Sequence, residues 1–147
     1  MKTDSAQINL VLAWLWITLG FVSGLALGLF FHREDWLGGY ASFKRRLYRL
    51  AHISFFGLGA VNLLFWLTVN ALGVSGSAFG LASWAMVIGA VSMPICCVIM
   101  AHHSKTQLLF AVPIISLLMG GALTIFLVAT ANRLPAVNQQ TSTLNLP

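Results

Sequence analysis

Four long apolar segments, separated by short polar connections, dominate the chain. They cover residues 8–31, 50–72, 78–101 and 107–131. Each is longer than the about 20 residues that a helix needs to cross a bilayer. Alternation typical of strands is missing from the sequence, and a helix satisfies its own backbone hydrogen bonds in hydrocarbon. The pattern therefore predicts four transmembrane helices.

Composition supports a membrane location. The 147-residue chain is 59% hydrophobic and 7% charged, whereas a soluble domain carries about 25% charged residues. We therefore expect an all-α integral membrane protein with a single domain at 1–133. The tail at 134–147 is polar, and we expect it to be flexible. The first apolar segment exceeds the about 7–15 apolar residues of a signal peptide, so we expect it to be retained as a helix.

Basic residues mark one side of the four segments. Most of the 8 lysines and arginines lie in the first and third connections: Arg33, Lys44, Arg45, Arg46, Arg49 and Lys105. The second connection, 70–77, has no charge. The positive-inside rule makes the basic side cytoplasmic and puts both termini on the non-cytoplasmic side. The net charge of +5 then reflects contact with the lipid bilayer and its phosphates, and not nucleic acid. Trp14, Trp66 and Trp84 have matching depths near the opposite interface.

Short connections and small residues predict how the helices pack. Short connections make neighbouring helices antiparallel, which predicts an up-down four-helix bundle. Gly20, Gly24 and Gly28 share one helix face, where glycines allow close approach of a neighbouring helix. The same face would also suit a partner, either another membrane protein or a second copy in a homo-oligomer. Pro94 removes a backbone hydrogen bond from the third helix. Asn62 lies in mid-membrane, where an amide makes hydrogen bonds between helices.

All 4 histidines of the chain fall near the basic side: His32, His52, His102 and His103. Imidazole is a ligand for iron, copper and zinc. This clustering predicts haem b or another metal bound at the cytoplasmic face. His52 would be one axial ligand, with His102 or His103 as the second and His32 as the alternative.

Neighbouring residues fit a haem at His52. Gly59 follows His52 by two helical turns on the same face, so its missing side chain would admit a flat ring. The haem propionates would meet cations at the interface. The candidates for this role are Arg45, Arg46 and Arg49, together with Lys105.

A second pattern on the third helix suits copper. Met93, Cys96, Met100 and His103 recur at helical spacing, and such soft ligands bind monovalent copper. Cys97 is adjacent to Cys96, and neighbouring helical cysteines do not form a disulfide with each other readily.

Plainer interpretations stand beside both metal hypotheses. Interfacial histidines often contact lipid headgroups, and methionine and cysteine often only fill a core. The middle parts of the segments lack Asp, Glu, Lys and Arg, which proton-coupled transporters usually carry there. The sequence also lacks a nucleophile elbow and a phosphate-binding glycine loop. We therefore expect no independent catalytic activity.

The helix number and the histidines near helix ends resemble small four-helix membrane cytochromes and copper-resistance D-type membrane domains. The resemblance implies histidines paired across helices around a cofactor. The resulting hypothesis is a multi-pass protein of the bacterial inner membrane that serves electron transfer or a respiratory-type complex. Its alternatives are a cofactor-free accessory or assembly subunit that binds partner helices and anionic lipid, and a copper-handling protein.

Overall fold

The computed structural model describes residues 4–73, 76–103 and 105–131. Four α-helices cover most of them: α1 Asp4–Phe30, α2 Phe43–Leu72, α3 Ser77–His102 and α4 Ala111–Ala131. Two short 3-10 helices, η1 Trp36–Gly38 and η2 Gln107–Phe110, lie in the connections. The described residues contain no strand, and four helices are long and apolar enough to cross a membrane. The predicted all-α membrane fold is confirmed, and the tail at 134–147 lies outside the described residues.

Helix α2 begins at Phe43, well before the apolar segment that starts at residue 50. Ser42 caps this end, because its hydroxyl oxygen accepts a hydrogen bond from the backbone N–H of Arg45 at 3.1 Å. Such a cap satisfies a backbone donor that the first turn leaves unpaired. The basic residues 44–49 are therefore helical rather than part of the first connection.

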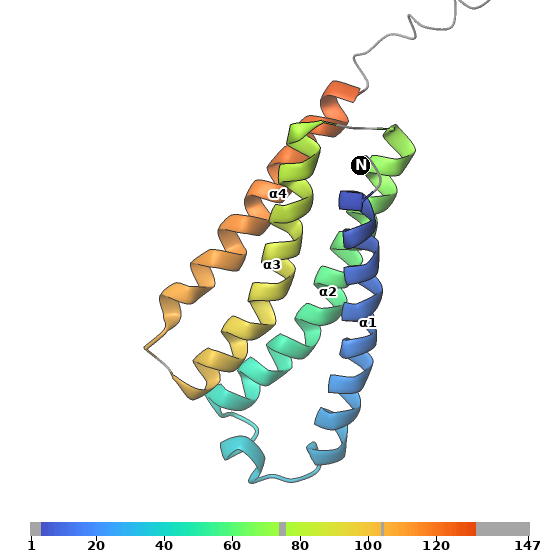
Figure 1. Ribbon diagram of the computed structural model, residues 1–147. Coiled ribbons are helices and arrows are strands. Elements are labelled where there is room, and N and C mark those ends of the chain that lie inside the picture. Colours follow the sequence, from blue (N-terminus) through green and yellow to red (C-terminus); the bar gives the residue numbers. More distant parts are fainter. Residues whose placement is uncertain (1–3, 74–75, 104, 132–147) are drawn as a thin grey trace, which may run out of the picture.

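Each helix packs mainly against its neighbour in the chain, so α1 lies on α2, α2 on α3 and α3 on α4. Contact between α1 and α3 is limited, and α4 touches α2 only slightly. Figure 1 shows α3 between α1 and α4, with η1 and the start of α4 at one end of the molecule. We call this the η1 end, and we call the opposite end, where α2 ends and α3 begins, the far end.

An apolar core joins α2, α3 and α4 toward the far end. Its buried members are Phe65, Val69, Phe79, Ala82, Met86 and Leu127. The rings of Phe65 and Phe79 stack with their centroids 6.1 Å apart. Gly89 and Gly120 let α3 and α4 approach, since a side chain at either position would meet Leu117 or Met86.

Three buried polar residues connect α1, α2 and α3, and we call them the amide cluster: Asn9, Asn62 and Ser83. The Asn9 side-chain amide donates to Asn62 Oδ1 at 2.8 Å and to the Ser83 carbonyl at 3.4 Å. The Ser83 hydroxyl donates to Asn9 Oδ1. The expected interhelical role of Asn62 is confirmed, because its side-chain oxygen accepts from Asn9, while its amide donates to the carbonyl of Leu58 in its own helix.

Helix α3 continues through Pro94. A proline has no N–H, so the carbonyl of Ala90 lacks its usual donor within the helix. The indole N–H of Trp16, on α1, donates to this carbonyl at 3.0 Å. The hydrogen bond that Pro94 removes from α3 is thus replaced by one between α1 and α3.

Candidate functional site

A chamber of about 330 Å³ lies at the η1 end between α1, α2 and α3. Its polar lining residues are Ser23, Tyr48 and His52, and its aromatic lining includes Phe30, Trp36 and Phe55. We call it the His52 chamber. The chamber places an imidazole beside aromatic rings. The helices around it are apolar enough to span a membrane. Such an apolar pocket with a few polar groups is the usual form of a small-molecule site.

His52 is held from one side by α1. Its Nδ1 lies 2.9 Å from the hydroxyl oxygen of Ser23. That hydroxyl also lies 3.0 Å from the carbonyl of Gly20, one turn earlier. His52 thus has a fixed hydrogen-bond partner on one ring nitrogen, while Nε2 has none among the described residues.

Glycines of α1 make the space for this imidazole. A Cβ at Gly24 would lie 2.9 Å from Cε1 of His52, and one at Gly20 would lie 2.8 Å from the Phe56 ring. The His52 and Phe56 rings meet edge to face, with centroids 5.5 Å apart. The glycine face therefore packs against α2 of the same chain at these two positions. At Gly28 a Cβ would meet no atom within 4 Å.

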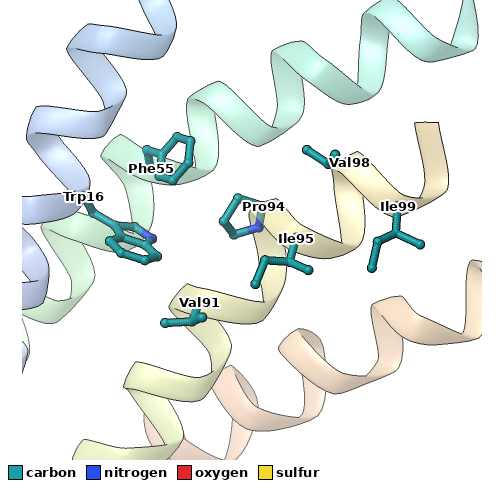
Figure 2. Close-up of a pocket in the computed structure, with 7 residues that line it drawn as sticks. All are labelled: Trp16, Phe55, Val91, Pro94, Ile95, Val98 and Ile99. Atoms are coloured by element: carbon teal, nitrogen blue, oxygen red, sulfur yellow. The ribbon is translucent and has the colours of Figure 1, made fainter. Parts of the chain in front are cut away.

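An apolar groove continues from the chamber toward mid-membrane. It has a volume of about 330 Å³ and shares Phe55 and Val98 with the chamber. Figure 2 shows Trp16 and Phe55, from α1 and α2, on one side of the groove, and residues of α3, including Pro94, on the other. Residues of α1, α2 and α3 line both the chamber and the groove.

The other three histidines lie elsewhere at the η1 end. Nε2 of His102 is 3.0 Å from the Tyr48 hydroxyl, and Tyr48 lines the chamber. His32, His102 and His103 are all exposed and line neither the chamber nor the groove. The structure therefore brings His102 to the edge of the chamber through Tyr48, and it gives His52 and His102 different partners.

Gly59 faces α1 rather than the chamber. A Cβ at Gly59 would lie 3.1 Å from the carbonyl oxygen of Ala13 and 3.3 Å from Cβ of Trp16. The space that the sequence suggested for a flat ring at this position is filled by a helix backbone. Gly59 allows α1 and α2 to approach closely, which is a common use of glycine in membrane helices.

The side chain of Arg45 is bound to the backbone of the first connection. Its side chain is 1% exposed, and its guanidinium donates to the carbonyls of Phe31 at 2.8 Å and Arg33 at 3.3 Å. The guanidinium also lies 3.9 Å from the centroid of the Tyr40 ring, a cation–π contact. Arg45 therefore holds segment 31–42 to α2, whereas Arg46 and Arg49 are exposed.

The residues of the copper hypothesis lie along α3 toward the η1 end. The Cys96 thiol donates to the carbonyl of Leu109 at 3.3 Å, and Met93 and Met100 are half-buried. His103 is exposed where α3 ends. Among residues 4–73, 76–103 and 105–131, no group of three or more histidine, cysteine or acidic side chains is placed to hold a metal ion.

Comparison with protein-family models, curated proteins and solved structures finds no match to this chain.

Sequence reasoning missed three residues that shape the site: Asn9, Trp16 and Ser23. The sequence did contain a usable signal, since Asn9, Ala13, Trp16 and Gly20 recur at helical spacing. The structure shows that all four are buried. A polar residue inside an apolar span also points toward a packed helix face. Ser23 carried no such signal, because serine in a membrane helix commonly bonds only to its own backbone.

Proposed function

We propose that this chain is a multi-pass membrane protein of a redox system, and that it binds a redox-active ring ligand in the His52 chamber. One observation carries the proposal. His52 lines an apolar chamber with Nδ1 engaged by Ser23 and with Nε2 unpartnered among the described residues. A histidine whose second nitrogen is held by a hydrogen bond is the usual form of a metal-ligating imidazole.

Haem b is the ring that this chain's residues suit best. His52 would supply one axial nitrogen, and the rings of Phe55 and Trp36 would contact the macrocycle. His102 is the favoured second ligand, because Tyr48 holds it at the edge of the chamber. Haem propionates would meet Arg46 or Arg49, which are exposed, and not the enclosed Arg45.

The test is a reduced-minus-oxidised visible spectrum of the protein purified in mild detergent, together with quantified haem and metals. We expect haem bands that His52→Ala abolishes and that His32→Ala leaves unchanged, since His32, unlike His102, makes no hydrogen bond to a residue of the chamber within the described part of the chain. A preparation without haem and without stoichiometric metal would reject the proposal. Haem bands that persist in His52→Ala would reject His52 as the ligand.

The proposed orientation places the η1 end in the cytoplasm, with an up-down helix order and both termini on the other side. The exposed Arg33, Arg46, Arg49 and Lys105 at the η1 end support this orientation by the positive-inside rule. A reporter enzyme that is active only outside the cytoplasm should be active when fused after residue 147. The same reporter should be inactive when fused after residue 105. The reverse pattern in bacterial cells would overturn the orientation.

A cofactor-free accessory subunit is the second candidate. Within the described residues, no buried side-chain nitrogen or oxygen lacks a hydrogen-bond partner. Native folds satisfy their buried polar groups, and the described part of this one does so with its own residues, which is compatible with a protein that holds no cofactor. In that case the exposed cations at the η1 end would contact anionic lipid. The haem measurement separates the two candidates, and stoichiometric copper in the same preparation would instead support the copper hypothesis.

A further inference from the structure

The direction in which Ser23 donates its hydroxyl proton determines which ring nitrogen of His52 carries a proton. The Ser23 oxygen lies 3.0 Å from the carbonyl of Gly20 and 2.9 Å from Nδ1 of His52. A hydroxyl has one proton to donate and lone pairs to accept with. Serines in membrane helices commonly donate to the carbonyl three or four residues earlier. With its proton on the Gly20 carbonyl, Ser23 can only accept from His52, so Nδ1 carries the ring proton.

The surroundings of Nε2 favour the same arrangement independently. Nε2 has no hydrogen-bond partner among the described residues, and no unpartnered side-chain nitrogen there is buried. Nε2 is therefore accessible, and it lies beside Gly24, where a Cβ would be 3.5 Å away. An N–H on Nε2 would be an unpaired donor among the described residues, and native structures tolerate unpaired donors less than unpaired acceptors. A lone pair on Nε2 is the arrangement that costs less.

We propose that Ser23 is a positioning residue that holds His52 as its Nδ1–H tautomer, so that Nε2 carries the lone pair that a ligand of His52 would meet. A lone pair selects the class of ligand. It binds a metal centre in a ring, or it accepts a proton from a hydroxyl group. It gives no hydrogen bond to a ligand that offers only carbonyl oxygens, such as an oxidised quinone.

This assignment deepens the proposed function, because it names the ligand chemistry of the same chamber. The tautomer of the ligand-free protein is nevertheless a property of Ser23 and His52 alone. It can be measured whether or not haem binds, so the two proposals can fail separately.

Nitrogen NMR of ¹⁵N-histidine-labelled protein in detergent, above the pH where imidazole is charged, measures the tautomer directly. The triple variant His32→Gln/His102→Gln/His103→Gln leaves His52 as the single imidazole of the 4 in the chain, provided that no histidine tag is used. If this variant does not fold, the spectra of wild type and His52→Gln are compared instead. The signals that are missing in His52→Gln are then those of His52.

We expect a protonated Nδ1 and an unprotonated Nε2 in this background. Ser23→Ala should move the proton to Nε2 in part or in full, and Ser23→Thr, which keeps a hydroxyl, should restore the original pattern. Ser92→Ala is the matched control, because the Ser92 hydroxyl bonds only to carbonyls of its own helix. It should leave the His52 signals unchanged.

Haem titration of Ser23→Ala and Ser92→Ala in the otherwise wild-type chain, where His102 is present, provides the second measurement. Loss of an outer hydrogen bond to a metal-ligating histidine typically lowers metal affinity about 10- to 100-fold, so we expect this loss in Ser23→Ala and not in Ser92→Ala. A proton on Nε2 in the starting protein, or an unchanged pattern in Ser23→Ala, overturns the role of Ser23 even if haem binds. The expected tautomer in a protein that takes up no haem supports the role of Ser23 and rejects the haem proposal.

Discussion

The indole N–H of Trp16 donates to the carbonyl oxygen of Ala90 across the α1–α3 contact, at a distance of 3.0 Å. Ala90 is four residues before Pro94, so this carbonyl has no donor within α3. Trp16 also lines the apolar groove. The Trp16 side chain therefore supplies the hydrogen-bond donor that Pro94 removes, and it also lines the groove beside Pro94.

Trp16→Phe should destabilise the protein by about 0.6 kcal/mol, the average for hydrogen bonds between membrane helices, and by no more than about 1.7 kcal/mol. In a Pro94→Ala background the same change should cost less, because residue 94 then donates to Ala90 itself. Unfolding in mixed detergent micelles measures both values as a double-mutant cycle. Trp14→Phe is the control, since Trp14 is 60% exposed. Equal costs of Trp16→Phe in the two backgrounds would reject the link with Pro94.

The amide cluster should behave as one unit. Asn9→Leu removes the donor to Asn62 and the acceptor of the Ser83 hydroxyl, and it should lower stability by about 1–3 kcal/mol because buried polar groups lose partners. The double variant Asn9→Leu/Asn62→Leu should lose less than the two single losses combined. Asn70→Leu is the control, because the exposed Asn70 bonds only within α2. Strict additivity in the same unfolding measurement would contradict coupling.

Gly24 and Gly28 should differ although they belong to one sequence pattern. Gly24→Ala puts a methyl group 2.9 Å from Cε1 of His52, whereas Gly28→Ala meets nothing within 4 Å. We expect Gly24→Ala to shift the imidazole, to weaken ligand binding in the chamber and to change the His52 nitrogen signals. Gly28→Ala should leave all three unchanged. If both variants match wild type in the NMR spectrum, the imidazole does not depend on the space at Gly24.

Arg45 should not tolerate replacement by lysine. Lysine lacks the planar fork that donates to the carbonyls of Phe31 and Arg33 while lying over the Tyr40 ring. We expect Arg45→Lys to cost about 1.5–3 kcal/mol, the scale of a hydrogen bond made by a charged group. Backbone hydrogen exchange in segment 31–42 should become faster.

Arg46→Lys supplies the comparison, because Arg46 is exposed and makes no side-chain hydrogen bond that holds this segment. It should leave the exchange rates near those of wild type. Equal acceleration in the two variants would show that loss of a guanidinium at either position, and not the enclosed contacts of Arg45, loosens segment 31–42.

The sequence predicts the spans well because crossing a bilayer requires long apolar helices, and their length can be counted directly. It predicts a role for Asn62 because an amide is conspicuous among apolar residues. It does not predict that Gly59 packs on Ala13 or that Arg45 is enclosed. Both depend on the rotation of one helix against another, which the apolar segments leave undetermined because their residues are hydrophobic on every side.

The same limit applies to the histidines. The shared depth of the histidines follows from the ends of the apolar segments. Depth alone does not say toward which neighbouring helix each side chain points. Only the packing of α1 on α2 places His52 beside Ser23, and only the approach of α3 places His102 beside Tyr48. The haem, copper and accessory hypotheses therefore arise from the same sequence pattern, and the measurements above are needed to separate them.

The position of α4 outside the His52 chamber has a consequence for biogenesis. The residues that line the His52 chamber come from α1, the first connection, α2 and α3, and none comes from α4. A chain is synthesised from its N-terminus, and its early parts fold first. All the residues that line the chamber are thus made before the last helix leaves the insertion machinery, so a ligand of the proposed site would not have to wait for the completed chain.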